Sequence, residues 1–589
     1  MPASVAHAPG AAEPRRIVVI GGVAAGPKAA ARARRRDPHA EITVVERGAV
    51  LSYAGCGLPF YVEGLIDHAQ ELYATASGAV RDTAFFRNVK DITVLDRTEA
   101  ERVDRVARMV HVHSLVTGER RALPYDSLVL ATGATPMRPP IDGIGLRNVF
   151  QLHHPSDAVA MRHLLDAGHV ERAVVIGGGL IGLETAAALV ERHVRVTVVE
   201  LLDHLLGPLL DPEMATYLEA RLRRRLELRL GERVLAIEGD DTGAAAAVRT
   251  ASGRIDAQLV LVATGVRPNV QLARDAGLEI GPTGAIAVDD RLRTSDPAIF
   301  AGGDCAQNVH LVSGEPCFVP LGSTANKHGR VIGDNVTGGD TRFPGVAGTT
   351  ALTVLGTDVA RTGVTEAQAR ARGQDVLTAL VPGHDRAHYY PTSSRIVVKL
   401  VARRTDGRLL GAQVVGPGEA AKRIDVLAAA LSHHATLDDL ADYDLCYAPP
   451  INTAIDALAQ AANVARNTRD GLLRSLSAAD LKAALDAGAP LVVVDVRSED
   501  EVADASLDDP RVVHVPLEQL RGRLSELPRD SDLVVVCAAG VRAYDALRTL
   551  QGAGFDRARV LEGGLATWPY PLRRRSPAVA AAAGRLRVK

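Results

Sequence analysis

Residues 16–26 read RIVVIGGVAAG, and this stretch decides the fold of the first part of the chain. A β-branched run enters a glycine turn, and the helix-forming sequence AARARRR follows. A strand, a glycine turn and a helix in this order are the context of a dinucleotide-binding fingerprint, in which the helix N-terminus binds a pyrophosphate. Glu46 ends the next predicted strand, twenty residues after Gly26, where a carboxylate that binds a ribose hydroxyl is expected.

The same pattern recurs at residues 172–182, RAVVIGGGLIG, where all three glycines of the fingerprint are present. Glu200 ends the following strand, eighteen residues after Gly182. Two nucleotide sites in one chain allow electrons to pass from one nucleotide to the other. A carboxylate at Glu200 repels a 2′-phosphate, and residues 201–204 contain no arginine, so the sequence predicts NADH rather than NADPH.

Three further segments identify the arrangement of these two sites. Residues 125–133, YDSLVLATG, and residues 259–269, LVLVATGVRPN, are near copies in which a strand enters a Thr-Gly turn. Residues 299–304, IFAGGD, form a strand that ends in a carboxylate. With these motifs the chain resembles the flavoprotein pyridine nucleotide-disulfide reductases over about residues 16–467. It resembles most the branch with a single redox cysteine, which contains coenzyme A-disulfide reductases, NADH oxidases and NADH-dependent persulfide reductases.

The resemblance implies which residues bind the two cofactors. The FAD site is expected to include Gly21, Gly22, Ala25, Gly26, Glu46, Ser52, Thr132, Gly133, Asp304 and Ala325. The NADH site is expected to include Gly177, Gly179, Gly182, Glu184, Glu200 and Gly265. Within this set Glu184 matches the glutamate of the nicotinamide pocket. No metal site is predicted, because the 18 histidines show no ligand spacing.

Cys56 stands alone in residues 51–59, LSYAGCGLP, because the chain contains no CxxC or CxxxxC motif. A single cysteine beside a flavin can be oxidised only by pairing with a small thiol, a sulfur atom or oxygen. We expect Cys56 to be the nucleophile, with a thiol pKa lowered by a helix N-terminus and by the flavin. Cys305, Cys317 and Cys446 are expected to be small core residues.

Three motifs match the dimerisation domain of the same branch: HYYP at 388–391, KRIDV at 422–426 and YAPP at 447–450. Tyr389, Tyr390 and Tyr447 match tyrosines that, in that branch, approach the active cysteine from the partner subunit. A phenol can protonate a leaving thiolate or orient a sulfur substrate. The alternative is that these aromatic residues only pack at the interface. Either reading predicts a homodimer.

The last part of the chain is a separate module. A buried strand leads into CAAGVR at 537–542, and a helix follows it. This segment resembles the six-residue catalytic loop of a rhodanese domain, which implies that Cys537 carries sulfur as a persulfide and that Arg542 adds positive charge beside it. Residues 475–480, SLSAAD, are expected to open the first helix of this module with a serine cap, and residues 467–470 are expected to form a linker before it.

The fold class expected for the whole chain is α/β: two Rossmann-like dinucleotide-binding domains, an α+β dimerisation domain and a C-terminal α/β rhodanese domain. The expected boundaries are a tail at 1–15, an FAD-binding domain at 16–149 and 265–337, an NAD(H)-binding domain at 150–264, a dimerisation domain at 338–467, a rhodanese domain at 474–573 and a tail at 574–589.

The predicted function is FAD-dependent, NADH-driven reduction of CoA disulfide, CoA persulfide or polysulfide. Gly55, Leu180 and residues 451–457 differ from the residues common in the branch, which weakens the case for CoA itself as the substrate. The fused rhodanese module favours a persulfide substrate. Reduction of persulfide, polysulfide or CoA persulfide therefore ranks equally with reduction of CoA disulfide. Two alternatives remain: an NADH oxidase that reduces oxygen through a cysteine sulfenic acid, and a non-enzymatic redox sensor.

The composition and charge of the chain bear on its binding partners and its cellular compartment. A net charge of −2 gives no reason to expect nucleic acid, and no apolar run reaches the ~18 residues of a membrane span. Five scattered cysteines without framework spacing predict a reducing, cytoplasmic location.

Overall fold

The computed structural model describes residues 13–574 and divides into two compact units. The first comprises the chain up to Leu201 together with Gly231–Val346, and the second comprises Leu202–Leu230 together with the chain from Ala347. The tails predicted at 1–15 and 574–589 lie almost wholly outside the described residues. Among the described residues, every helix is too short or too polar to cross a lipid bilayer.

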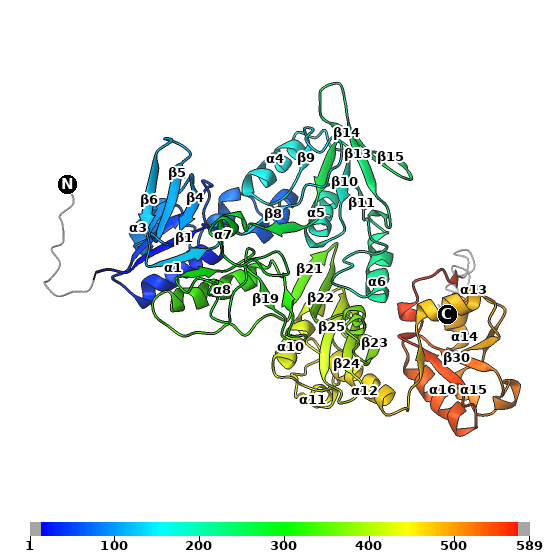
Figure 1. Ribbon diagram of the computed structural model, residues 1–589. Helices are drawn as coiled ribbons and strands as arrows, with labels where there is room; N and C mark the ends of the chain where they lie inside the picture. Colours follow the sequence, from blue (N-terminus) through cyan, green and yellow to red (C-terminus); the bar gives the residue numbers. More distant parts are fainter. Residues whose placement is uncertain (1–12, 575–589) are drawn as a thin grey trace. The chain divides into compact units, whose positions relative to one another are not determined.

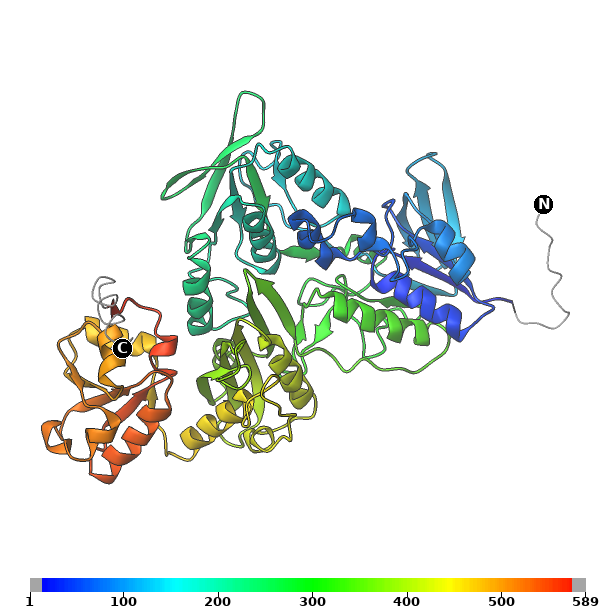
Figure 2. The ribbon, with the colours of Figure 1, turned by 180° about the vertical axis from the view of Figure 1, so that it is seen from behind.

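The first unit contains a five-stranded parallel sheet in the order β18-β7-β1-β2-β3. Its strands are β18 (Ile299–Ala301), β7 (Ser127–Leu130), β1 (Arg16–Ile20), β2 (Glu41–Val45) and β3 (Thr93–Leu95). The valine- and isoleucine-rich runs are buried on both faces, as expected of a parallel sheet covered by helices. Helices α1 (Ala25–Arg36) and α8 (Gly322–Asn335) lie side by side in both views (Figure 1, Figure 2).

A second parallel sheet of this unit has the order β11-β10-β16-β9. Its strands are β11 (Arg195–Val199), β10 (Arg172–Ile176), β16 (Leu259–Val262) and β9 (Val149–Phe150). Helices α4 (Pro155–Asp166) and α5 (Leu180–Glu191) belong to this part of the chain. Two antiparallel sheets extend the unit: β4 (Thr98–Asp104), β5 (Met109–Ser114) and β6 (Arg120–Pro124), and β13 (Val234–Gly239), β14 (Ala245–Thr250) and β15 (Gly253–Asp256).

The second unit contains an antiparallel sheet in the order β21-β22-β25-β24-β23. Its strands are β21 (Thr350–Val354), β22 (Thr357–Gly363), β25 (Leu409–Gly416), β24 (Arg395–Arg403) and β23 (Val376–His384). Helix α10 (Ala420–Ser432) packs on β22 and β25, and α12 (Ala457–Arg469) packs on β23 and β24. Helices α6 (Pro212–Leu222), α9 (Glu366–Ala371) and α11 (Leu437–Ala441) complete this part.

The end of the chain forms a parallel sheet in the order β26-β31-β30-β27-β29. Its strands are β26 (Ser475–Leu476), β31 (Ala558–Leu561), β30 (Asp532–Val536), β27 (Leu491–Asp495) and β29 (Val512–His514). Its helices are α13 (Ala478–Asp486), α14 (Glu499–Asp504), α15 (Leu517–Leu520) and α16 (Val541–Gly552). Ser477 caps α13 by accepting a hydrogen bond from the backbone N–H of Asp480, as predicted.

The linker predicted at 467–470 was wrong, because α12 continues to Arg469. Arg466 and Arg469 both form ion pairs with Asp438 of α11, at 2.8 and 2.6 Å. These contacts across neighbouring helices favour continuation of a helix whose local sequence, Asn-Thr-Arg-Asp, is typical of a loop.

A buried lysine in the second unit forms ion pairs with three carboxylates. Lys399 on β24 is 1% exposed, and its Nζ lies 3.0 Å from Asp211 and 2.7 Å from Glu366, with Glu213 also in contact. Asp211 in turn accepts hydrogen bonds from the backbone N–H groups of Glu366 and Ala367 at the start of α9. One ammonium group therefore binds three carboxylates from two separated segments of the chain.

Candidate functional site

The first glycine turn connects β1 to α1, and two of its positions require glycine. Gly21 has a φ of +114°, and a Cβ there would lie 2.1 Å from the carbonyl oxygen of Ala131; a Cβ on Gly26 would lie 1.9 Å from that of Gly21. Glu46 accepts hydrogen bonds from the N–H groups of Gly22 and Gly48, both at 2.6 Å. Helix α1, which begins at Ala25, has no side-chain cap, so its N–H groups are available to a pyrophosphate.

The second glycine turn repeats this geometry between β10 and α5. A Cβ on Gly177 would lie 2.4 Å from the carbonyl oxygen of Ala263, and one on Gly182 would lie 2.0 Å from that of Gly177. Glu200 accepts a hydrogen bond of 2.6 Å from the N–H of Gly178, as Glu46 does from Gly22. Gly179 has no atom within 4 Å of a Cβ position and caps α5 without a side chain, which leaves room for a phosphate.

The two Thr-Gly turns meet where the chain passes between the two sheets of the first unit. Strands β8 (Ala134–Pro136) and β17 (Val266–Pro268) pair antiparallel just after Gly133 and Gly265. Thr132 donates its hydroxyl to the carbonyl oxygen of Asn269 at 2.7 Å, and Asn269 donates its amide to that of Thr132 at 2.8 Å. The Thr132 side chain thus joins the first Thr-Gly turn to the segment that follows the second.

Asp304 lies at the meeting point of two helix N-termini. A Cβ on the preceding Gly303 would lie 3.1 Å from that of Ala25 and 3.6 Å from that of Ala325, so the starts of α1 and α8 converge here. Burial raises the pKa of the Asp304 carboxyl group, which accepts no hydrogen bond from any residue between 13 and 574. A partly buried carboxylate without a donor fits the hydroxyl groups of a bound polyol chain.

Cys56 lies in a 3₁₀ turn, Gly55–Gly57, immediately before α2 (Leu58–Glu63), and α2 packs against α5. This packing brings the thiol close to Glu184 of α5. Ser52, with a φ of +50°, anchors the preceding loop by donating its N–H to the carbonyl oxygen of Gly22 at 2.9 Å. The cysteine loop thereby lies between the two glycine turns.

The expectation of a lowered pKa for the Cys56 thiol was wrong for the protein groups alone. Desolvation raises this pKa most, and the charges of Glu184 and Asp304 raise it further, although the residue keeps exposed surface. Burial also raises the pKa of Glu184 to about 7. The six-residue helix α2 does not outweigh two carboxyl groups in a partly desolvated site.

Sequence reasoning missed Tyr53, three residues before the cysteine. Its ring lies edge-on to that of His154, with centroids 5.3 Å apart. Burial and the charges of Glu46, Asp157 and Asp304 raise the pKa of its phenol to about 12. The signal available in the sequence was its place in the segment that carries Cys56.

Two of the predicted tyrosines meet in the second unit. Tyr389 and Tyr447 are 65% and 53% exposed, and a hydrogen bond that the Tyr389 hydroxyl donates to Tyr447 raises the pKa of Tyr389. Tyr390 is half-buried, and its N–H donates to the carbonyl oxygen of Ala387 at 2.8 Å. The structure therefore forms a phenol pair from Tyr389 and Tyr447, which are far apart in sequence.

Cys537 directly follows β30 in the C-terminal domain and is 1% exposed. Its Sγ accepts a hydrogen bond of 3.1 Å from the N–H of Gly540, and helix α16 begins at the next residue. Leu565 and Ala566 donate backbone hydrogen bonds of 2.9 Å to the carbonyl oxygens of Cys537 and Ala538. This loop curls over the strand end, as expected of one that holds a persulfide anion.

Arg542 does not present a free positive charge to Cys537. Its guanidinium binds Glu501 of α14 through two hydrogen bonds of 2.7 and 2.8 Å, and this contact lowers the pKa of Glu501 to about 2. Glu501 was missed because it lies 41 residues before Arg542. Its only sequence signal is the capping box that it forms with Ser498.

The remaining cysteines differ in environment. Cys305 is buried, as predicted, and its Sγ lies 3.4 Å from the carbonyl oxygens of Leu130 and Gly302. Cys317 is half-buried, and Cys446 is exposed, so the prediction of a core residue was wrong for Cys446. Cys446 precedes Tyr447 in a surface loop, where packing does not cover it.

Comparison with protein families identifies three segments. Residues 15–319 match the model of the pyridine nucleotide-disulphide oxidoreductases, and residues 349–459 match the dimerisation domain of that family. Residues 477–569 match the rhodanese-like domain.

Individual relatives agree with these matches. The NAD(P)H sulfur oxidoreductase (CoA-dependent) of Pyrococcus abyssi is 38% identical over 76% of this chain and 97% of its own length. An NADH oxidase of Enterococcus faecalis is 33% identical over 76% of this chain and 99% of its own.

Solved structures extend the similarity into the C-terminal domain. The NAD-dependent persulfide reductase from A. fulgidus has a TM-score of 0.89 and 45% identity, covering 94% of this chain and all of that one. The reduced CoADR-RHD of Bacillus anthracis has a TM-score of 0.88 and 32% identity, covering 94% of this chain and 98% of that one.

Proposed function

Because the chain belongs to the pyridine nucleotide-disulphide oxidoreductase family, we propose that it is an NADH-driven flavoprotein reductase of persulfides, polysulfides and CoA disulfide. One observation carries this proposal: a lone cysteine beside the cofactor turns and a rhodanese-type cysteine loop belong to the same chain. A sulfur carrier fused to a sulfur reductase raises the effective concentration of its substrate.

The family implies FAD and NAD(P)H, and the geometry fits both cofactors. The uncapped N-termini of α1 and α8 and the unbonded Asp304 carboxylate would hold FAD. The turn at Gly177–Gly182 would hold the nicotinamide nucleotide, with Glu184 toward the nicotinamide. We propose NADH over NADPH because the Glu200 carboxylate already binds the turn and would repel a 2′-phosphate. CoA is proposed as the thiol carrier of the sulfur substrate.

In the proposed reaction the Cys56 thiolate attacks the sulfane sulfur of a persulfide, R–S–SH. A Cys56–S bond forms, the S–S bond of the substrate breaks, and the leaving thiolate takes a proton from a tyrosine phenol, which solvent reprotonates. Bound FAD supplies the two-electron transfer from NADH that this sulfur requires. Cys56 Sγ holds the sulfur until it leaves as hydrosulfide, and the thiolate is regenerated.

Three further points belong to the proposal. The dimerisation domain supports a homodimer in which Tyr389 and Tyr447 of one subunit serve the Cys56 site of the other. Cys537 would accept sulfane sulfur and deliver it to Cys56. We propose a reducing, cytoplasmic compartment, because all five cysteines are free. The domain boundaries predicted from the sequence remain our assignment.

Oxygen reduction is the second candidate, and the similarity to an NADH oxidase favours it. In that reaction a peroxide formed from oxygen would oxidise the Cys56 thiolate to a sulfenic acid, which two further electrons would reduce. The phenol pair would then have no thiolate leaving group to protonate.

The test is anaerobic stopped-flow of the wild type and Cys56→Ser with NADH, followed by CoA persulfide, CoA disulfide, polysulfide or oxygen. We expect the variant to keep bound FAD and its reduction by NADH, because the cofactor residues lie elsewhere, and to lose turnover with every sulfur substrate. Full turnover of Cys56→Ser with sulfur substrates would refute the assignment of Cys56. Oxygen as the only acceptor used by the wild type would favour the oxidase.

A further inference from the structure

The Tyr389–Tyr447 phenol pair is formed by two surface segments that little packing supports. Both rings are more than half exposed, so the hydrophobic effect does not hold them in place. One backbone hydrogen bond joins the two segments directly, from the N–H of Ala387 to the carbonyl oxygen of Pro449 at 3.2 Å. The distance between the phenols therefore depends on how the ends of both segments are anchored to the domain.

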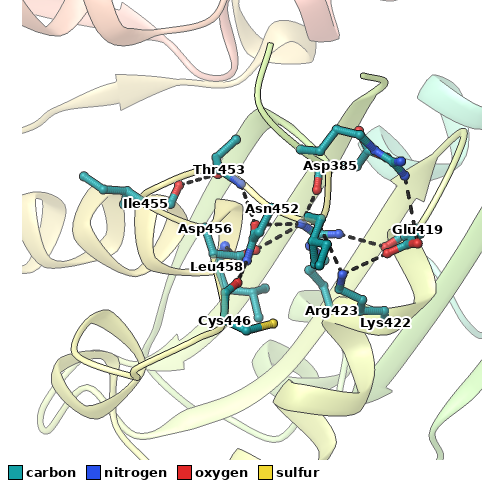
Figure 3. A network of polar contacts seen from close by, with 12 residues as sticks. Asp385, Glu419, Lys422, Arg423, Cys446, Asn452, Thr453, Ile455, Asp456 and Leu458 are labelled. Atoms are coloured by element: carbon teal, nitrogen blue, oxygen red, sulfur yellow. Dashed lines mark hydrogen bonds and ion pairs between the residues drawn. The ribbon is translucent and has the colours of Figure 1, made fainter. Parts of the chain in front are cut away.

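Both segments are anchored to one buried guanidinium, that of Arg423 on α10, which is 1% exposed (Figure 3). Its Nη2 donates to the carbonyl oxygen of Asp385 at 2.5 Å, at the start of the Tyr389 segment. The same nitrogen donates to Asn452 Oδ1 at 3.0 Å, at the end of the Tyr447 segment. Asp456 Oδ2, 3.1 Å away, supplies the compensating charge.

Asn452 extends this contact to the residue next to Tyr447. Asn452 is 3% exposed, and its Nδ2 donates to the carbonyl oxygen of Cys446 at 3.3 Å. Its backbone N–H donates to the carbonyl oxygen of Ala448 at 2.9 Å, which closes the turn that follows Tyr447. Arg423, Asn452 and the Cys446 carbonyl thus form a continuous chain of hydrogen bonds, and Figure 3 shows the Asn452 side chain between the guanidinium and Cys446.

Stability alone is a weak reason for an arginine in this position. A buried ion pair is often no more stabilising than well-packed apolar side chains of similar volume, because both charges lose their hydration. Arg423 also leaves its Nε without a hydrogen-bond partner among the described residues. The planar guanidinium holds its donors at fixed angles: Nη1 donates to the carbonyl oxygen of Glu419 at 3.1 Å while Nη2 faces the two segments. The donors of a lysine ammonium rotate freely and lack this fixed arrangement.

We propose that Arg423 and Asn452 are positioning residues that set the contact between the Tyr389 and Tyr447 phenols and, through it, the rate of the sulfur step. The inference rests on the proposed function, since the phenol pair has a chemical role only if a thiolate leaves at Cys56. Neither residue touches the substrate; each acts through the tyrosines.

Two variants test the proposal in the full-length holoenzyme. Asn452→Leu removes the three side-chain hydrogen bonds of Asn452, with Arg423, the Cys446 carbonyl and the Thr453 N–H, and keeps the branched shape of the side chain. Arg423→Lys keeps the charge but not the planar geometry. The matched control is Arg403→Lys, which changes an exposed ion pair with Asp406 in the same domain. NADH reduction of the bound flavin, measured anaerobically, is expected to stay unchanged in all three, because the network lies outside the nucleotide turns.

The rate of reoxidation by CoA persulfide is expected to fall by about tenfold or more in Asn452→Leu and Arg423→Lys, and not in Arg403→Lys. A second readout is tyrosinate absorbance, taken as a difference against Tyr389→Phe to isolate one of the 11 tyrosines. The midpoint for Tyr389 should fall toward its ordinary value of about 10 when the contact with Tyr447 is lost. A merely structural role would not move this midpoint in a folded protein.

A double-mutant cycle separates positioning from general damage. If Asn452 acts through Tyr447, Asn452→Leu costs almost nothing further in a Tyr447→Phe background. A full additional loss in that background, or an unchanged Tyr389 midpoint in both variants, would overturn the inference. If Cys56→Ser retained sulfur turnover, the proposed function itself would fail, and the Tyr389 titration would still report on the positioning.

Discussion

Replacing Glu184 by glutamine tests the electrostatics of the Cys56 site. Glu184 is half-buried on α5, and burial raises the pKa of its carboxyl group from 4.5 to about 7. Each pKa unit corresponds to about 1.4 kcal/mol, so keeping the ionised form in the folded protein costs about 3 kcal/mol. A glutamine of nearly the same shape removes this cost without opening a cavity.

The pH dependence follows from the direction of the shift. Between the two pKa values the folded state binds a proton that the unfolded state has lost, so stability falls as pH rises from about 4.5 to about 7. Glu184→Gln should lack this fall, and its advantage over wild type should approach about 3 kcal/mol above pH 7 and vanish below about pH 4.5. Removal of the Glu184 charge should also lower the pKa of the Cys56 thiol.

Denaturant midpoints of the holoenzyme at about pH 5 and about pH 8 measure the first effect. The pH profile of Cys56 alkylation by iodoacetamide, followed on the Cys56 peptide by mass spectrometry, measures the second. Glu171→Gln is the control, because this side chain in the same unit is 77% exposed. The reasoning is refuted if wild type and Glu184→Gln show parallel stability curves and the same alkylation profile.

Three other predictions concern separate parts of the chain. Lys399→Met should destabilise the protein by about 3–5 kcal/mol, because it leaves buried carboxylates without a partner charge. The control Lys422→Met, which removes an exposed ion pair with Glu419, should cost less than about 1 kcal/mol. Calorimetry measures both melting temperatures, and equal values for the two variants would contradict this prediction. Cys537→Ser should slow turnover with thiosulfate, polysulfide or persulfide donors and leave CoA-disulfide reduction nearly unchanged; wild-type rates on every donor would exclude delivery by Cys537. NADH should exceed NADPH in kcat/KM because of Glu200, and comparable values for the two nucleotides would argue against that role.

Features that depend on neighbouring residues were predictable from the sequence. The glycine turns were predictable because the turn itself requires a positive φ at Gly21 and Gly177 and brings Gly26 and Gly182 against their carbonyl oxygens, and these demands are local. The cap at Ser477 was predictable for the same reason. The matches to three family models confirm the predicted family and fold class, including the rhodanese-like domain.

Contacts between distant segments were decided by the tertiary structure. The pKa of Cys56 depends on Glu184 and Asp304, which packing of α2 on α5 and the end of the first sheet bring near the thiol. The charge of Arg542 is paired because α14 places Glu501 beside it. Arg423 acquires acceptors 29 to 38 residues away.

Local sequence patterns thus determined the elements, the turns and the types of reactive group in this protein. Which group pairs with which was decided by folding, because the electrostatic energy of a buried charge depends on partners that no local pattern specifies.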